Sequence, residues 1–429
     1  MAAMGSARAH ASTAAWSALV VGLVLGPLGA ASADAEPPAA RLTLDDAVRL
    51  ATRDNPGLHA KQLEVRAVRA NEVTAALRPD PVAEYRAEQL GGRSFPATDA
   101  IPQYTVSLSQ LIETGGKRQH RVESARAATT VSGYELADLQ RQLVAQVKKA
   151  FVAILVAQDA LALARANLSN LDEVERIQAV RAQQGDISEL ELSRLRAQRY
   201  AFERDALDAE QALRAARITL RTLIGPDAIA EDFAAEGALA LQEVPGDRAQ
   251  FYRQMLDYRP DIRAAEAGQR RAQADAALAR ANAWWDFSPM VEYQRIGGDN
   301  TIGFGLSLPV RIFDRNQGEI LRTRAEIARA DALREAALIQ ARSDLENALS
   351  AMATEREKVL ALRDVYLNQA QRIRDTVEFA YRRGGLSLLD YLDAQRSYRE
   401  TSLEYLRALG AHQGAVYDLE AAVGGPLAH

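Results

Sequence analysis

Apolar residues recur every three or four positions along most of this chain, which is the period of an amphipathic helix. Between Lys117 and Ala182 the pattern runs without a proline, and it predicts a rod of roughly 100 Å. A second helix is expected from Ser188 to Ile224. The same pair of patterns returns at Gln317–Arg383 and Ser387–Val423. The chain is therefore predicted to be mainly α-helical, with long paired rods.

Each long helical pattern stops at a glycine and restarts behind a serine. Gly185 precedes Ser188 in the first half of the chain, and Gly384 precedes Ser387 in the second. Glycine permits the left-handed conformation that ends a helix, and a serine hydroxyl can cap the next one. Each place is therefore predicted to be the tip of a helical hairpin. Because the tips lie about 200 positions apart, we interpret the chain as two copies of one unit.

At two places in each copy, the spacing of apolar residues changes from every three or four positions to every second position. Tyr104, Val106 and Leu108 alternate with polar residues, which is typical of a strand. Strands are expected over 82–90, 101–112, 286–296 and 300–312, giving the fold a small β part. The repeats are expected to span residues 34–240 and 241–424, with a short tail over 425–429.

In the last predicted strand, apolar side chains alternate with glycine and serine, and we expect the apolar side to face lipid. These positions are Ile302, Phe304, Leu306 and Leu308. The alternative is an ordinary soluble sheet. The membrane interpretation is favoured by the small residues on the opposite face and by the form of the N-terminus.

The N-terminus has the form of a secretory signal peptide. Arg8 precedes an apolar stretch from Ala14 to Ala30, and Ala31-Ser32-Ala33 has the small-x-small form of a cleavage site. Residues 1–33 are therefore predicted to be removed. The alternative, a single membrane anchor, is disfavoured because the apolar run is short and poor in large residues. No later segment is long and apolar enough for a transmembrane helix. The strands of a membrane β-barrel alternate apolar and polar residues, so a search for long apolar runs does not detect them.

Composition narrows the function classes further. The chain of 429 residues has a net charge of −5 and no cysteine, so disulfides are excluded and nothing indicates a nucleic-acid partner. The five histidines have no ligand spacing with one another, and no metal site is visible. Because no cofactor motif or nucleophile–base set is found either, we expect no enzyme.

The predicted elements are incomplete within one chain. Rods of this length cannot bury their apolar stripes alone, and four strands can neither close a barrel nor protect their edges. Several copies around an axis would solve both problems. Strands from all copies would form one barrel, and the rods would form one long tube.

The duplicated order of elements and two motifs resemble the outer-membrane efflux protein family of TolC, over residues 40–424. One motif is Gly384-x-x-Ser-x-x-Asp-x-x-Asp-Ala-Gln395, behind the second tip. The other, Ser109-Gln-Leu-Ile-Glu-Thr-Gly-Gly-Lys-Arg118, is similar to the strand-to-helix junction of the cobalt–zinc–cadmium cation efflux branch. Many relatives have a proline in the place of Leu111.

The resemblance implies a homotrimeric, TolC-like channel in the outer membrane. Twelve strands, four from each chain, would form a barrel in lipid, and the helices would form a periplasmic tunnel. The implied function is passive conduction of heavy-metal cations, together with a periplasmic membrane-fusion adaptor and an inner-membrane pump of the resistance-nodulation-division (RND) type. The alternatives are a conduit for drugs or for type I secretion and, in a different class, a periplasmic coiled-coil scaffold.

The resemblance also assigns roles to acidic residues behind the second tip. Asp390 and Asp393 match aspartates that narrow the periplasmic entrance, and their i, i+3 spacing puts them on one helix face. Three copies would then bring rings of carboxylates to the pore, as in cation-selective constrictions. The alternative is an ordinary solvated helix face.

Further residues match the entrance gate and the adaptor-docking tips. Tyr381 and Glu191 match a tyrosine and an acid that hold the entrance shut. The matching arginine position is Leu386 here, so the expected substitutes are Arg194, Arg382 and Arg383. The residues expected to dock the adaptor are Gly185, Ser188, Gly384, Gly385, Ser387, Leu388 and Leu389.

Overall fold

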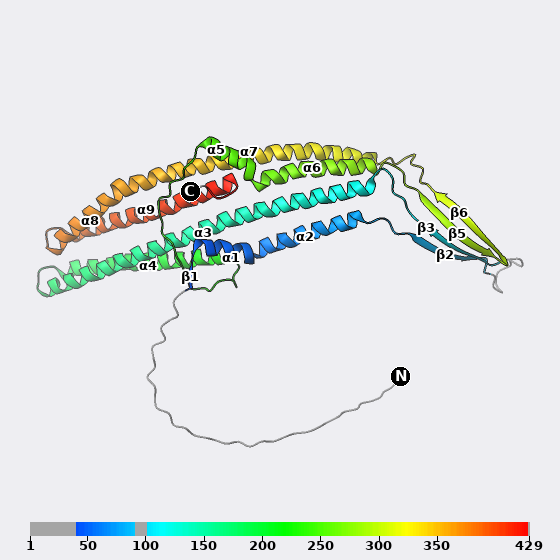
Figure 1. The fold of residues 1–429 in the computed structure, drawn as a ribbon. Helices are drawn as coiled ribbons and strands as arrows, with labels where there is room; N and C mark the ends of the chain where they lie inside the picture. The colour runs from blue at the N-terminus through cyan, green and yellow to red at the C-terminus, as the bar shows by residue number, and fades with distance from the viewer. Residues whose placement is uncertain (1–39, 91–100, 428–429) are drawn as a thin grey trace, which may run out of the picture. The chain divides into compact units, whose positions relative to one another are not determined.

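The computed structural model describes residues 40–90 and 101–427, which belong to one compact unit (Figure 1). The predicted signal peptide lies outside the described residues, as do Gly91 and Gly92 of the expected loop between the first two strands. Helices dominate the described chain, as the periodicity predicts. Within the described ranges, no helix is both long and apolar enough to cross a membrane.

The elements follow the predicted order in both halves of the chain. The first half contains α1 (Leu44–Asp54), α2 (Pro56–Ala76), β2 (Val82–Glu88), β3 (Gln103–Ser109), α3 (Lys117–Gln183) and α4 (Glu189–Ile224). The second half contains α5 (Arg248–Tyr258), α6 (Pro260–Ala281), β5 (Ser288–Ile296), β6 (Asp299–Ser307), α7 (Gln317–Ala361), α8 (Leu367–Arg382) and α9 (Leu388–Val423).

Polar caps set the helix boundaries that the sequence indicates. The Thr43 hydroxyl accepts a hydrogen bond from the Asp46 amide at 3.2 Å and begins α1. Asn55 ends α1, and its side chain accepts from the Leu58 amide at 2.8 Å. With Pro56 at the first helical position, Asn55 therefore also begins α2.

The second long rod is helical from Gln317 to Arg382, in agreement with the predicted rod over Gln317–Arg383, but it contains one turn that the sequence does not predict. A π-helical turn, Leu362–Tyr366, separates α7 from α8, and the Leu367 amide donates to the Leu362 carbonyl. The side chain of Asn368 donates to the Arg363 carbonyl at 2.9 Å, which satisfies an acceptor in the widened turn. Such a turn adds only one residue, a change that the mixed 3/4 spacing conceals.

The structure also contains a short parallel strand pair outside the four strands that the alternation predicts. Strand β1 (Ala40–Leu42) pairs with β4 (Phe233–Ala235), and Phe233 is fully buried. The Glu236 amide extends the pair by donating to the Leu42 carbonyl at 2.8 Å. Strands of three residues are too short for alternation to be recognised.

Four strands form an antiparallel sheet in the order β2-β3-β5-β6. Each half of the chain supplies one hairpin, and the hairpins join where β3 pairs with β5. Among the described residues, no strand covers the outer edge of β2 or of β6. The helices repeat this order, because α2 packs on α3, α3 on α6 and α6 on α7.

The sheet has one apolar and one polar face. One row across the apolar face consists of Tyr85, Val106, Tyr293 and Ile302. A row across the polar face consists of Glu84, Ser107, Glu292 and Gly303. The residues predicted to face lipid are exposed: Ile302 by 70%, Phe304 by 86%, Leu306 by 67% and Leu308 by 40%. An apolar face of this kind marks a surface that lipid or another chain covers.

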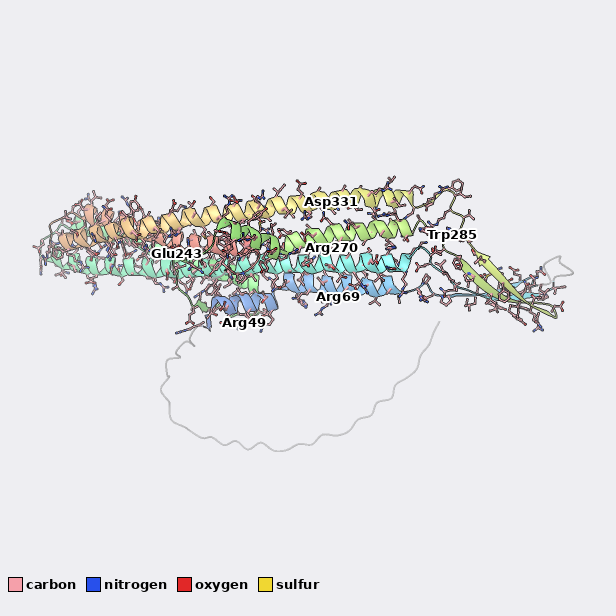
Figure 2. The ribbon with its side chains drawn as sticks, turned by 45° about the horizontal axis from the view of Figure 1, so that its top comes forward. Arg49, Arg69, Glu243, Arg270, Trp285 and Asp331 are labelled. Atoms are coloured by element: carbon pink, nitrogen blue, oxygen red, sulfur yellow. The ribbon has the colours of Figure 1, made fainter. Side chains whose placement is uncertain are left out.

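The two halves are tied together where strands meet helices. Lys117, at the start of α3, is 5% exposed and donates to the Asp286 carboxylate at 2.6 Å and to the Trp284 carbonyl at 2.9 Å. The Thr114 amide donates to the same carboxylate at 2.9 Å. Figure 2 shows Trp285 at this junction between the helices and the sheet.

Candidate functional site at the helical tips

The two predicted hairpin tips lie side by side and enclose a hollow of about 420 Å³. Gly185 and Gly384 adopt the left-handed conformation, with φ of 80° and 79°, that the sequence predicts. Residues from both tips line the hollow, namely Arg181, Asp186, Ile187, Ser188, Leu190, Glu191, Arg194, Tyr381, Gly384, Leu386, Ser387, Leu388 and Leu389. The structure therefore brings most of the predicted gate and docking residues into the lining of one hollow, whereas Arg382, Arg383, Gly185 and Gly385 do not line it.

Serine caps begin the returning helix at each tip, as predicted. The Ser188 hydroxyl accepts from the Glu191 amide at 3.2 Å, and the Ser387 hydroxyl accepts from the Asp390 amide at 3.2 Å. At the second tip, the Asp390 carboxylate also accepts from the Ser387 amide at 3.1 Å and from its hydroxyl at 2.6 Å. Asp390 is therefore half of a capping box, a role beyond the one that its spacing from Asp393 indicates.

The two aspartates behind the second tip are exposed, as an entrance constriction requires. The Ser387 hydroxyl, with the backbone amide of the same residue, lowers the pKa of Asp390, so this carboxylate stays charged. Asp393 forms an exposed ion pair with Arg396 at 2.5 Å. Arg396 therefore offsets part of the negative charge that sequence reasoning assigned to this helix face.

An apolar cluster holds the tips together. Tyr381 stacks on Tyr391, and both are buried with Leu388 against Leu171 and Leu195 of the first hairpin. Leu388 is 7% exposed, whereas its neighbour Leu389 is 76% exposed. Of these two predicted docking residues, only Leu389 has an exposed side chain.

The predicted gate residues have partners that the sequence does not reveal. Arg382 binds Glu378 at 2.6 Å and approaches Glu173 of the other hairpin at 3.7 Å. The Arg383 guanidinium lies 3.9 Å from the centre of the Phe379 ring, and Arg194 is exposed. Within one chain, then, Arg382 is the predicted arginine that links the two hairpins.

The Tyr381 hydroxyl is buried and has no hydrogen-bond partner among the described residues. Burial, followed by the negative charge of Glu191, raises the pKa of Tyr381 to about 12, while nearby Arg181 acts in the opposite direction. The hydroxyl is therefore neutral. Arg181 also lies against Gly384, where an added Cβ would stand 2.9 Å from its guanidinium. Sequence reasoning missed Arg181, although it lies four residues before Gly185.

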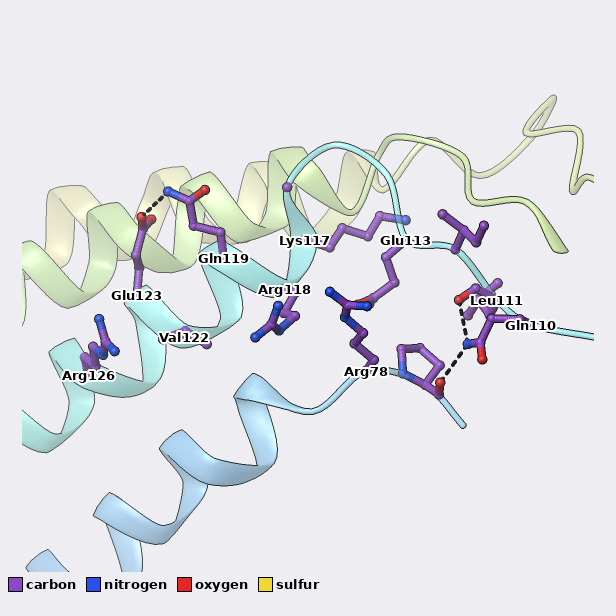
Figure 3. A pocket seen from close by; sticks show the side chains of 13 residues that line it. Arg78, Gln110, Leu111, Glu113, Lys117, Arg118, Gln119, Val122, Glu123 and Arg126 are labelled. Atoms are coloured by element: carbon purple, nitrogen blue, oxygen red, sulfur yellow. Dashed lines mark hydrogen bonds between the residues drawn. The ribbon is translucent and has the colours of Figure 1, made fainter. Parts of the chain in front are cut away.

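A larger hollow of about 930 Å³ lies where β3 meets α3 (Figure 3). Its cationic side chains come from Arg78, Lys117, Arg118 and Arg126, and Lys117 is committed to the Asp286 contact. Glu113 forms an ion pair with Arg121. No set of side chains with acid–base or nucleophilic geometry is formed by these residues.

Across residues 40–90 and 101–427, no group of three or more histidine, cysteine, aspartate or glutamate side chains could hold a metal ion.

Comparisons with known proteins show the family of this chain. The family model for outer membrane efflux proteins matches residues 47–226 and 251–425. The cobalt-zinc-cadmium resistance protein CzcC of Cupriavidus metallidurans is 26% identical over 389 residues, which cover 89% of this chain and 90% of that protein. The pyoverdine export outer membrane protein OpmQ of Pseudomonas aeruginosa is 29% identical over 314 residues, covering 70% of this chain and 65% of that protein.

Solved structures confirm the predicted fold. A crystal structure of CusC matches with a TM-score of 0.77 at 20% identity, covering 89% of this chain and 92% of that chain. A membrane protein from Pseudomonas aeruginosa matches with a TM-score of 0.76 at 23% identity, covering 90% of each chain. The family consists of passive conduits rather than enzymes. The chain therefore belongs to the outer membrane efflux protein family and is an outer-membrane channel component of an efflux system.

Proposed function

We propose that this chain is the outer-membrane conduit of a heavy-metal cation efflux system. It forms a homotrimer in which twelve strands span the lipid and the helices form a periplasmic tunnel. A periplasmic adaptor and an inner-membrane RND pump deliver the cations, and the pump supplies selection and energy. The likeness to a cobalt-zinc-cadmium resistance protein along 89% of the chain supports the choice of substrate.

The observation that carries the proposal is the two-faced sheet. Its apolar face exposes Phe304 and Ile302, and its polar face carries Glu84, Arg86 and Glu292. A sheet that is apolar outside and polar inside suits a water-filled pore in lipid. A periplasmic scaffold would have no use for such a face.

The same proposal gives roles to the residues at the helical tips. Asp390 and Asp393 form the acidic constriction at the entrance, and Arg382 with Tyr381, Glu191, Arg194 and Arg383 surrounds the gate. Leu389, which is 76% exposed, is the main apolar contact residue of the adaptor-docking surface. Gly185, Ser188, Gly384, Gly385, Ser387 and Leu388 shape that surface.

The domain boundaries are part of the proposal. Residues 1–33 form a cleaved signal peptide, residues 34–240 and 241–424 form the two repeats, and residues 425–429 form the tail. The repeated element order and the two separate matches to the family model support this division.

A second candidate function is export of an organic molecule. The 29% identity to a pyoverdine export protein favours it, because that relative carries a far larger substrate than a metal ion. The tunnel of a passive conduit places few demands on cargo, so the pump decides between the two functions.

A deletion strain tests both candidates. Loss of the gene is expected to lower the inhibitory concentrations of cobalt, zinc and cadmium salts several-fold, and the intact gene restores them. Metal tolerance that is unchanged, with a loss of drug tolerance or of siderophore export, would replace the first candidate by the second. Unchanged tolerance and export, with the protein soluble after sarkosyl extraction, would contradict a conduit.

A further inference from the structure

The hollow where α2 ends and α3 begins has no role in the proposed conduit (Figure 3). Its volume of about 930 Å³ lies within the usual range of small-molecule sites. Pro79, just before β2, and Gln110, just after β3, both line it. The hollow therefore begins at the level where the strands leave the sheet.

The hollow adjoins the apolar side of the sheet. The ladder between β3 and β5 continues beyond β3, because the Gln110 amide donates to the Pro289 carbonyl at 3.2 Å. The Ile112 amide likewise donates to the Phe287 carbonyl at 2.9 Å. Alternation along this extension places Gln110 and Ile112 on the side of Leu108, which belongs to the apolar face. Both of these residues line the hollow.

The position of the hollow on α3 agrees with this orientation. Val122 lines the hollow, and Phe151 lies about eight helical turns further along α3, so the two residues share one face of the helix. At Phe151 this face packs against Phe233 of β4, in a second layer of chain. In a tube, such a layer lies outside, because on the inside it would block the passage. The hollow is therefore on the outer surface of the proposed tunnel.

Two arginines of the hollow have guanidinium groups that are free to bind an anion. Arg78, between α2 and β2, is exposed and forms no hydrogen bond or ion pair within the described residues. Arg118 donates from Nε to the Ala76 carbonyl at 2.7 Å, and its terminal nitrogens have no partner in the described chain. This bond orients the planar group and leaves its other donors for a ligand. The planar fork of arginine matches two oxygens of a phosphate.

The carboxylates of the lining leave the end near the sheet positively charged. Glu113 accepts hydrogen bonds from both terminal nitrogens of Arg121, one of them at 2.9 Å, so its charge is offset. Glu123 lies more than one helical turn further along α3 than Arg118, and Arg126 lines the hollow near that level. These two opposite charges offset each other in part.

We propose that this hollow binds the phosphate group of a phospholipid in the periplasmic leaflet of the outer membrane, with Arg78 and Arg118 as the phosphate-binding residues. The inference rests on the proposed orientation of the sheet in lipid, and it adds a ligand that conduction does not require. The ends of membrane-spanning strands lie where hydrocarbon gives way to lipid head groups. The hollow is thus placed at the depth of the phosphates.

The apolar part of the lining suits the rest of a lipid molecule. Ile112 is 40% exposed, and Val122 lies on the same side of the helical layer as the hollow. Beyond Ile112, the apolar face of the sheet continues through Leu108. An acyl chain can follow this face while its phosphate stays at the arginines, whereas a free phosphate ion would use the arginines alone. The proposal therefore commits to a lipid as the source of the phosphate.

Lipid binding to the purified mature protein, stripped of lipid in detergent, tests the site by native mass spectrometry. The probes are dioleoyl phosphatidylglycerol, dioleoylglycerol without a phosphate, and inorganic phosphate. We expect one tightly bound phosphatidylglycerol molecule for each chain, much weaker binding of dioleoylglycerol, and little displacement by inorganic phosphate at equal concentration. Higher ionic strength should weaken the binding, because its specific part is electrostatic.

The Arg78→Gln, Arg118→Gln variant is expected to bind phosphatidylglycerol roughly tenfold or more weakly, because two charge-assisted contacts are lost. The Arg66→Gln, Arg69→Gln variant is the matched control. It removes the same number of charges from exposed positions of α2 that do not line the hollow, so its affinity should equal that of the parent. If the first variant fails to assemble, Arg78→Glu replaces it, since Arg78 has no contact within the described chain that folding requires.

Equal affinity of the parent and of the Arg78 variants would overturn the site. Equal binding of dioleoylglycerol would overturn phosphate recognition, and full displacement by inorganic phosphate would overturn the lipid as its source. Conductance of the same preparations in planar bilayers reports separately on the conduit. A parent that conducts but binds no phosphatidylglycerol contradicts only this inference, whereas a parent that binds the lipid but does not conduct contradicts only the proposed function.

Discussion

Tyr381 and Tyr391 stack with their ring centroids 4.9 Å apart and their planes 16° from parallel. The pair joins α8 to α9 directly behind the second tip, where both rings are almost completely buried. Because the Tyr381 hydroxyl has no partner among the described residues, stacking rather than hydrogen bonding provides the contact. The tip is therefore held by an aromatic core inside one hairpin.

Substitutions of Tyr381 separate these two kinds of contact. Tyr381→Phe keeps the ring, so we expect unchanged channel conductance and unchanged heat stability. Tyr381→Ala opens a cavity, which is expected to cost about 3 to 5 kcal/mol locally and to raise the resting conductance in planar bilayers. If the phenylalanine variant leaks as much as the alanine variant, the hydroxyl forms a gating hydrogen bond after all.

Adjacent leucines at the second tip should respond differently to charge. Leu389→Asp changes an exposed side chain, so we expect normal protein levels in the outer membrane with loss of metal tolerance, because adaptor docking fails. Leu388→Asp places a charge in the buried cluster with Tyr391, and it should lower resistance to protease at the tip. Normal metal tolerance in the Leu389→Asp strain would remove this residue from the docking surface.

The sequence predicts the structure correctly where a residue type acts through its own backbone conformation or through its immediate neighbours. Gly185 and Gly384 end helices because they adopt φ near 80°, and Ser188 and Ser387 begin them by capping. Such signals need no knowledge of distant residues. The strand alternation that places Phe304 on the apolar face is equally local.

It failed where the outcome depends on packing or on a second role. Leu388 and Leu389 are identical in type, and only the direction of the helix against Leu171 and Leu195 buries one of them. Asp390 resembles a pore residue by its spacing from Asp393, yet it also caps α9. The π-turn before Leu367 has no residue signature of its own.

The dual role of Asp390 decides how the constriction must be tested. In Asp390→Asn, Asp393→Asn each side chain keeps one oxygen that can accept hydrogen bonds, but both charges are lost. We expect weaker cation preference and weaker block by divalent cations in planar bilayers, with unchanged trimer yield. Unaltered selectivity and block would leave these residues as a solvated helix face.

Ser387→Ala is the matched control for that experiment. It removes the hydroxyl of the capping box, which should cost the tip about 1 kcal/mol, but it retains both carboxylates. Cation preference should therefore stay at its normal level. A loss of preference in this control would attribute the effect to tip disorder rather than to charge.

Buried His412 on α9 is expected to make the folded state less stable at acidic pH. It is 1% exposed, and its Nδ1 atom has no partner among the described residues. Burial is the main cause that lowers its pKa; Arg356 acts in the same direction, and Glu243 and Glu355 act against it. Glu243 and Arg356 also bind each other at 2.8 Å, so their charges largely offset one another.

Because the folded chain resists protonation of His412, the unfolded chain binds the extra proton between the lowered pKa and the ordinary value of 6.5. Stability is therefore expected to be complete above that value and to fall as the pH decreases through it. His412→Leu should flatten the dependence of the unfolding midpoint between pH 7.5 and pH 5, measured with denaturant in detergent, as expected from the direction of the shift. The exposed His59→Gln is the control and should keep the parent's slope. Equal slopes in the parent and in His412→Leu would show that His412 does not govern the stability of the fold in this pH range.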